Sequence, residues 1–386
     1  MNRAIFYFIV VLALTATGSA NANNVAKQQM TLVVETQQAI IGLAGSGTVT
    51  VDWGDGNIRA HTLSAEASYI YVSYPSKSAK TITIAGQDVR FLDCYRNQLI
   101  RLDVSKNPEL MELHCHNNQL TQLDLSKNPA LTKLNCRDNS LTQLDVRKNS
   151  ALTNLSCDDN QLSNLDVSKN PTLTELTCSR NLLTSLDISK NLALTELDCS
   201  SNKLTGLNVS NNSALTLLSC KGNLLTNLNV SKNFDLDYLD CLENQLNSLD
   251  VSENTALTQL HCGKNRLINL DVNDNKTLVY LSCLENQLTN LDVSKNVALK
   301  WLMCEKNHLT HLDVSNNMAL VHVNCAFNNF SETSLNLLFN TLHSNTSDTK
   351  GEIVIWGNQG IDNCDKSIAE KKGWTVSSVE ETIEEE

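Results

Sequence analysis

The stretch Leu131-Thr-Lys-Leu-Asn-Cys136-Arg-Asp-Asn139-Ser-Leu-Thr-Gln-Leu-Asp-Val-Arg-Lys-Asn149-Ser-Ala decides the fold, because most of the chain repeats it. A fixed period of this length is the sequence signature of a solenoid, in which one structural unit stacks on copies of itself. The cysteine of the repeat recurs at one constant interval without interruption, at Cys94, Cys115, Cys136, Cys157, Cys178, Cys199, Cys220, Cys241, Cys262, Cys283, Cys304 and Cys325.

The repeat matches the pattern L-x-x-L-x-L-x-x-N-x-L, with cysteine in the third leucine position. Over residues 89–330 the chain resembles the cysteine-type leucine-rich repeats of internalin J and related exported bacterial surface proteins. The resemblance implies a mainly β, right-handed leucine-rich-repeat solenoid of 12 short coils. It also implies cysteines that remain reduced, and a binding function without catalysis.

Each repeat divides into two similar halves, and each half ends on an asparagine. We therefore expect extended segments on both sides of every coil and no room for a helix. Because the halves have nearly equal length, they predict a slender, weakly curved rod. Twelve coils at the usual strand spacing give a length of roughly 55 Å.

The first residues have the composition of a signal peptide, expected over 1–22. A short basic start precedes the apolar run Ala4–Ala16, and Ala20-Asn21-Ala22 forms an A-x-A cleavage site. An uncleaved anchor is the alternative, but the run is short for a membrane span. We expect a mature chain that is secreted or at the cell surface, with the periplasm as another possible compartment and no transmembrane segment.

Residues 24–88 are expected to form a small β domain that caps the array. Alternating apolar and polar residues predict strands over 48–51, 69–72 and 81–84. The Asp55-Gly56 pair predicts a tight turn, and Asp52-Trp53-Gly54-Asp55-Gly56 resembles the signature of PKD-like β-sandwich modules. We interpret Asp52 and Asp55 as turn residues, with calcium binding as the alternative.

Residues 331–376 are expected to form a C-terminal cap of mixed α/β structure. Leucine and phenylalanine at helical spacing over 335–342 predict a helix with Ser331 as its N-cap, followed by a strand over 352–356. A second short helix is expected over 365–372, ending at Gly373. The glutamate-rich tail, residues 377–386, is predicted to be disordered.

Alternation along a strand turns every cysteine of the series into the core, on the same side as the leucine two residues earlier. His114 and His116 therefore point away from Cys115, so we predict no metal at this cluster and no cofactor elsewhere. Adjacent cysteines are near enough for disulfides, yet their Cβ vectors are parallel rather than convergent. We expect a ladder of buried, reduced thiols, with the state of Cys364 left open.

Two asparagine columns, Asn97 to Asn328 and Asn107 to Asn317, are unbroken at the same period and are expected to pair buried backbone groups. An aspartate column that includes Asp103, Asp145 and Asp313 has two interpretations. The first is turn capping, with a neighbouring lysine column as counter-charge. The second is a string of calcium sites.

Exposed residues that break the regular pattern are the candidates for recognition. In the C-terminal half, large side chains replace the small polar ones beside the cysteines, a change that indicates a binding patch. The patch candidates are Tyr238, Tyr280, Trp301, His322, Met303, Leu242 and Leu284. The secondary candidates at the start of the array are Phe91, Tyr95, Arg96, His114 and His116.

The formal charge of −12 argues against a nucleic-acid partner, because such proteins carry a basic surface. No catalytic motif stands outside the columns. The sequence therefore predicts a monomeric, non-enzymatic binding protein, an adhesin or recognition module that engages a protein or a glycan through its strand face. The alternatives are an enzyme that processes surface polysaccharides and a passive structural spacer.

Overall fold

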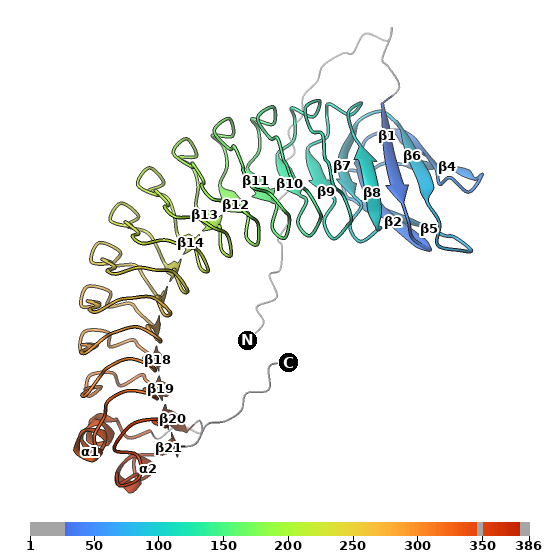
Figure 1. The fold of residues 1–386 in the computed structure, drawn as a ribbon. Coiled ribbons are helices and arrows are strands. Elements are labelled where there is room, and N and C mark those ends of the chain that lie inside the picture. Colours follow the sequence, from blue (N-terminus) through green and yellow to red (C-terminus); the bar gives the residue numbers. More distant parts are fainter. Residues whose placement is uncertain (1–27, 346–349, 379–386) are drawn as a thin grey trace.

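The computed structural model describes residues 28–345 and 350–378, which form a curved stack of coils with a β-rich unit at one end and two helices at the other (Figure 1). The expected signal peptide and residues 379–386 of the expected tail lie outside the described residues, whereas Ser377, the first residue of that expected tail, ends a strand. No helix among the described residues is long and apolar enough to cross a membrane.

A continuous sheet of parallel strands runs along the inner side of the arc (Figure 1). Each coil contributes one strand that ends directly before its cysteine, and neighbouring strands pair with a shift of one full repeat, as Leu134 with Leu155. The strands of the array are β7 (Val89–Asp93), β9 (Glu112–His114), β10 (Lys133–Asn135), β11 (Asn154–Ser156), β12 (Glu175–Thr177), β13 (Glu196–Asp198), β14 (Leu217–Ser219), β15 (Tyr238–Asp240), β16 (Gln259–His261), β17 (Tyr280–Ser282), β18 (Trp301–Met303) and β19 (His322–Asn324).

The core is one continuous set of columns. In the coil of β10, Leu134 and Cys136 are buried while Asn135 between them is partly exposed, so the predicted alternation is confirmed. All twelve cysteines of the series are fully buried and unpaired. Burial raises the pKa of these thiols, which keeps them protonated and inert. Leucines supply most of the remaining core, each contributing roughly 1.5–3 kcal/mol on burial.

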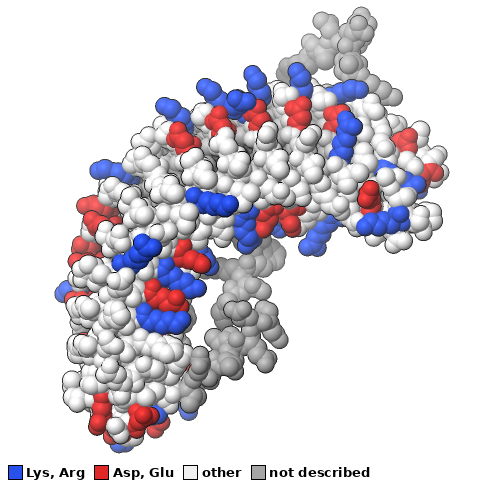
Figure 2. All heavy atoms as spheres, viewed as in Figure 1, with Lys and Arg blue, Asp and Glu red and all other residues white. Residues whose placement is uncertain are grey.

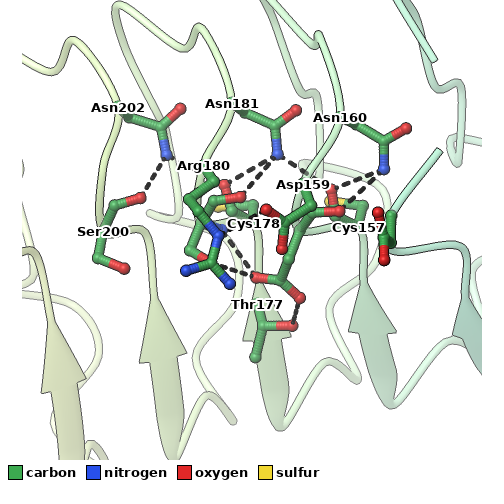
Figure 3. A network of polar contacts seen from close by, with 12 residues as sticks. Cys157, Asp159, Asn160, Thr177, Cys178, Arg180, Asn181, Ser200 and Asn202 are labelled. Atoms are coloured by element: carbon green, nitrogen blue, oxygen red, sulfur yellow. Dashed lines mark hydrogen bonds and ion pairs between the residues drawn. The ribbon is translucent and has the colours of Figure 1, made fainter. Parts of the chain in front are cut away.

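The first asparagine column pairs the backbone between coils, as predicted. Asn181 donates from Nδ2 to the carbonyl oxygens of Cys157, Cys178 and Ser179 at 3.0–3.1 Å (Figure 3). Its Oδ1 accepts from the N–H of Leu162 at 2.9 Å. The same pattern recurs from Asn118 to Asn328, so each of these asparagines joins its own turn to the coil before it, whereas Asn97 bonds to the backbone of Ile40.

In the second asparagine column only the amide nitrogen of each side chain forms hydrogen bonds. Asn149 donates to the carbonyl oxygens of Leu125 and Asn128 at 3.1 and 2.8 Å, but its buried Oδ1 has no hydrogen-bond partner among the described residues. The same holds for the other members of this column from Asn107 to Asn317. Its contribution to stability should therefore be smaller than that of the first column.

The stack bends more strongly than the weakly curved rod that equal half-repeats predict (Figure 1). Strand pairing holds the inner side at the narrow spacing of a β-sheet. Of the second half-repeats in the described residues, only Leu99–Asp103 forms a strand, β8. The others have sparse links between coils, such as Gln161 N–H to Leu141 C=O at 2.9 Å. The two sides are unequal because only one is a sheet.

The N-terminal strands extend both sides of the first coil. β1 pairs antiparallel with β8, and β2 pairs antiparallel with β7, so the apolar interior passes without a break into the array. The predicted strands are present, and Trp53 is fully buried. The strands are β1 (Gln29–Val34), β2 (Gln38–Gly45), β3 (Thr48–Asp52), β4 (Ile58–Thr62), β5 (Ser68–Ser73) and β6 (Lys80–Gly86).

The C-terminal end covers the last coil. Helix α1 (Glu332–Thr341) begins after Ser331, whose hydroxyl accepts from the N–H of Ser334, which confirms the predicted N-cap. Strands β20 (Gly351–Val354) and β21 (Trp374–Ser377) continue the parallel sheet, with α2 (Ser367–Glu370) between them in sequence. The sheet therefore extends past the strand of the last cysteine coil.

Candidate binding surface on the strand face

Three positions of each coil point outward from the inner sheet: the residues three before, one before and one after the cysteine. We call the surface that they form the strand face. Because the pairing shift equals the repeat length, residues at the same position of successive coils lie side by side. The sequence alone therefore determines which side chains are neighbours along each column.

Four rings form a continuous line on the C-terminal half of the strand face; we call Tyr238, His261, Tyr280 and Trp301 the aromatic row. The ring centroids are 5.3 Å apart for Tyr238 and His261, 4.7 Å for His261 and Tyr280, and 6.5 Å for Tyr280 and Trp301. Trp301 is 38% exposed, and the other three are partly exposed. The row presents ring surface to solvent in a fixed arrangement.

Sequence reasoning missed His261 as a member of the row. It lies one residue before its cysteine, whereas the tyrosines and Trp301 lie three before theirs. In the coil between the two tyrosines the equivalent position holds Gln259. Writing the two outward positions together, coil by coil, would have shown the histidine between the tyrosines.

An apolar strip borders this part of the strand face at the position after the cysteine. Leu242 and Leu284 are separated by the coil of Gly263, and both are partly exposed. A Cβ atom on Gly263 would lie 2.8 Å from Leu284 Cγ and 3.0 Å from Leu242 Cδ1. The absence of a side chain at Gly263 thus lets the two leucines meet in one surface.

Two carboxylates that sequence reasoning did not single out lie in the same region. Asp240 is buried and accepts from the N–H of Leu242 at 3.0 Å. Glu305 follows Cys304, and its Oε2 is buried without a hydrogen-bond partner in the described chain. Burial raises the pKa of both groups above their ordinary values. Neither forms an ion pair within the described part of the chain.

The remaining patch candidates also lie on the strand face. Met303 is partly exposed in the coil of Trp301. His322 Nδ1 lies 3.2 Å from Glu352 Oε2 on β20, so this side chain is already engaged with the C-terminal end. The structure thus brings Tyr238, Tyr280 and Trp301 into one row and places His322 at its margin.

The secondary candidates form a smaller cluster on the first coils. Phe91 and His114 meet edge to face at 5.3 Å, and Tyr95 stacks on His116 at 5.1 Å. Burial and the nearby Arg137 lower the pKa of His116 to about 4. Arg96, the fifth candidate, occupies a turn position with φ of 52°. These rings contact one another, and Tyr95 is 39% exposed.

The aspartates act as turn caps. Asp52 and Asp55 accept from the N–H groups of Gly54 and Asn57 at 2.9 Å. In the aspartate column, Asp145 accepts from the N–H of Arg147 at 3.0 Å, and hydrogen bonds from Arg147 lower its pKa to about 2. No group of three or more His, Cys, Asp or Glu residues that could hold a metal ion occurs among residues 28–345 and 350–378.

The expected lysine counter-charges are present, because neighbouring lysines help to lower the pKa of Asp103, Asp124 and Asp292, but the expected ladder of direct ion pairs is not formed. Figure 2 shows basic and acidic side chains close together along the outer turns of the first coils. Yet Arg147 with Asp145 is the one ion pair that the aspartate column makes within the described residues. Long lysine side chains at this exposed rim gain little from fixed pairing, which explains the difference.

Comparison with solved structures places the chain among leucine-rich repeat proteins. The functional domain of InlJ from Listeria monocytogenes, which includes a cysteine ladder, is 31% identical over 73% of this chain and 78% of that one, with a TM-score of 0.46. A leucine-rich repeat protein of Leptospira interrogans is 23% identical over 74% and 83%, with a TM-score of 0.63. The internalin InlF of Listeria monocytogenes is 18% identical over 76% and 87%, with a TM-score of 0.67. No family profile and no curated protein matches the chain.

Proposed function

Because the chain belongs to the leucine-rich repeat proteins with a cysteine ladder, we propose that it is a non-enzymatic binding protein whose strand face engages a protein or a glycan. The observation that carries this proposal is the aromatic row. Partly exposed rings in a fixed line give a large contact area at low entropic cost, and such residues dominate binding energy at interfaces. We further propose that the protein is secreted or held at the cell surface as an adhesin or recognition module.

The export proposal rests on the N-terminal segment that ends at Ala22 and has its own test. Cleavage after Ala20-Asn21-Ala22 gives a mature chain that begins at Asn23. N-terminal sequencing of the protein recovered from outside the cytoplasm should give that start, and an intact Met1 would contradict export by cleavage.

The polysaccharide-processing alternative needs two carboxylates, or a nucleophile and a base, in a hollow that holds substrate. A hollow of about 510 Å³ is lined by Lys306, His308 and Phe327 among others, and no carboxylate lines it. A second, of about 280 Å³, is lined by Asp250, Asp271 and Asp274. Asp250 and Asp271 are turn caps, each with its Oδ1 accepting a local backbone N–H. We therefore favour binding over catalysis.

The test replaces Tyr238, Tyr280 and Trp301 with alanine together. A matched control replaces three exposed apolar residues of the outer turns, Leu192, Phe234 and Met318, which are 61%, 48% and 63% exposed. The wild type and both variants are applied to arrays of glycans and of extracellular proteins. We expect loss of the bound partner in the first variant alone, with the thermal midpoint of unfolding recorded for each protein.

Retention of the partner by the first variant would remove the aromatic row as the binding site. If the wild type bound no glycan and no protein, a passive spacer would be the better interpretation. The outer-turn control matters because both variants lose apolar surface, so only position distinguishes them.

A further inference from the structure

We propose that the strand face is built for a basic segment of a protein partner, with lysine or arginine head groups at Glu305 and Asp240 and their aliphatic stems over the aromatic row. This inference rests on the proposed function, since it names the chemistry of the partner at the same surface. It excludes a neutral glycan as the principal ligand.

The first observation is the unpaired state of Glu305. Its Oε2 is buried and accepts no hydrogen bond from the described residues. The nearest cation in sequence, Lys306, is engaged elsewhere, because its Nζ lies 2.7 Å from Glu285 Oε1. A buried carboxylate oxygen without a partner destabilises the free protein, since nothing replaces the water it has lost. A cationic head group that donates to this oxygen recovers that free energy on binding.

The second observation is a second carboxylate at the other end of the row. Asp240, on β15, is buried and accepts a hydrogen bond from the N–H of Leu242, whereas Glu305 follows β18. Asp240 is buried close to Tyr238 and His261, and no cation of the described chain lies within ion-pair distance of it. Burial lowers the pKa of His261 and raises that of Asp240, while the charges of His261 and Lys221 act in the lowering direction on Asp240 without forming an ion pair with it. Two separate carboxylates along one row fit a partner that carries more than one basic side chain.

The third observation is the rings between these carboxylates. Tyr280 is within electrostatic reach of Glu305, because burial and the charge of Glu305 together raise the pKa of the phenol. Tyr238 is related to Asp240 in the same way. Cations are attracted to ring faces, most strongly to tryptophan, and the methylene stems of lysine and arginine pack on such rings. The row therefore offers both the charge and the apolar surface that these side chains need.

A neutral sugar satisfies this surface less well. A hydroxyl group can donate one hydrogen bond to Glu305, but it leaves the desolvated negative charge uncompensated. A bare metal ion also fits poorly, because no group of three or more ligating residues is present in the described part of the chain. A basic side chain brings both the donor and the opposite charge.

The proposal has a pH signature. A cation binds the ionised form of Glu305, so its affinity should rise as pH increases through the raised pKa of this carboxyl and then level off. Lys306 and Glu285 face Glu305 but pair with each other, so their charges largely offset. Tyr280 and the buried thiols of Cys283, Cys304 and Cys325 also lie near it and stay protonated over this range, because their pKa values are raised. A neutral ligand should show no such rise.

The experiment uses the whole mature chain and three probes: acetyl-tetralysine amide, the same peptide with every lysine Nζ acetylated, and chitotetraose. Binding is followed by the indole N–H signal of Trp301 in a nitrogen-15 spectrum, assigned by its loss in Trp301→Phe. The variants are Glu305→Gln and Asp240→Asn, which keep the size of each side chain. The control is Glu175→Gln, a partly exposed carboxylate of the strand face on β12, far along the sheet from Trp301 on β18.

We expect the charged peptide to bind about tenfold more tightly than the acetylated one. Glu305→Gln should weaken it about fivefold and reduce the rise with pH, the remainder coming from the raised pKa of Asp240. Asp240→Asn should weaken it several-fold, and Glu175→Gln should change it less than about twofold. If Glu305→Gln and Glu175→Gln had equal effects, the peptide would be attracted only by the overall negative charge of the protein, and the proposal would be overturned. The proposal would also be overturned if the charged peptide did not bind at millimolar concentration, or if chitotetraose bound more tightly than the charged peptide.

These outcomes are separable from failure of the proposed function. If the peptide results are negative but the alanine variant of Tyr238, Tyr280 and Trp301 still loses its array partner, the row binds and only its cationic specificity is wrong. If that variant keeps its partner, the row is not the binding surface. Thermal unfolding of the two carboxylate variants, expected to match or exceed the wild type because a desolvated charge is removed, shows that each is folded.

Discussion

Replacing Asn181 or Asn149 with alanine separates the two asparagine columns by their contribution to stability. Both side chains are buried, at 5% and 0% exposure, and both changes remove the same atoms. Any difference between the variants therefore reflects the hydrogen bonds that each side chain makes.

The expected loss in the free energy of unfolding depends on which backbone groups are left without any hydrogen-bond partner. In Asn181→Ala the carbonyl oxygens of Cys157 and Cys178 keep the amides of neighbouring asparagines at 3.2 and 3.0 Å. The N–H of Leu162 has no other acceptor in the described chain and becomes a buried donor without a partner. Such a group costs about 1–3 kcal/mol beyond the bonds lost. We expect about 4 kcal/mol for Asn181→Ala.

Substitution in the second column should lower the free energy of unfolding by less. The two carbonyl oxygens that Asn149 contacts also accept backbone N–H groups, at 3.1 Å for Leu125 and 3.2 Å for Asn128, and the unpaired Oδ1 disappears with the substitution. We expect about 2 kcal/mol for Asn149→Ala. Asn211→Ala, which removes one exposed bond of 3.3 Å, is the control and should cost under about 0.5 kcal/mol.

The assay is urea unfolding followed by circular dichroism, with hydrogen exchange as the local measurement. Repeat arrays unfold with limited cooperativity, so the free energies are compared only where the slope against urea is unchanged. Faster exchange at Leu162 in Asn181→Ala is the specific expectation. Equal or greater destabilisation by Asn149→Ala would refute the assignment of the larger role to the first column.

Three further predictions concern the core, the apolar strip and the first coils. Thirteen thiols per chain should react with a thiol reagent in denaturant without reductant. In the folded protein only Cys364 is partly exposed to the reagent. A count of one or no reactive thiol in denaturant would mean that the ladder is oxidised. Gly263→Val should cost about 1–3 kcal/mol, because its Cβ would lie 2.9 Å from the Leu284 carbonyl oxygen, whereas Gly206→Val meets nothing within 4 Å and should be near neutral in urea unfolding. His116 has a pKa of about 4 in the folded protein against an ordinary 6.5, so the unfolded chain binds the proton more readily and stability should fall as pH drops from 6.5 towards 4. His116→Gln should flatten that fall in unfolding measured across this range, and an unchanged slope would assign it to other groups.

Much of the fold could be predicted because the repeat constrains it at every coil. A constant repeat period fixes the pairing shift between strands, and alternation along each strand then fixes which side chains turn inward. The buried cysteines and the first asparagine column follow from these rules, and the Ser331 cap follows from the residue preference at helix starts. The curvature could not be predicted from these rules, because it depends on how many hydrogen bonds each side of a coil makes with the next coil.

The candidate site was predictable only in part. Column position identified Tyr238, Tyr280 and Trp301, because equal positions of successive coils are neighbours in space. Sequence did not identify Asp240 and Glu305, since a carboxylate one residue from a cysteine is exposed or buried according to what packs over it. The column position of Glu305, between Leu284 and Ala326, does not by itself say which carboxylate oxygen is buried.

The sequence by itself determined the solenoid, its inward cysteines and which side chains lie on the strand face, because each follows from strand alternation and from a repeat period that every coil obeys. Only the tertiary structure decided that His261 completes a row of rings, that Gly263 lets Leu242 and Leu284 meet, and that an oxygen of Glu305 is buried without a partner in the described chain. These features depend on side-chain packing between coils. A period specifies which residues are adjacent, and packing specifies which of their polar atoms lose water and find no replacement.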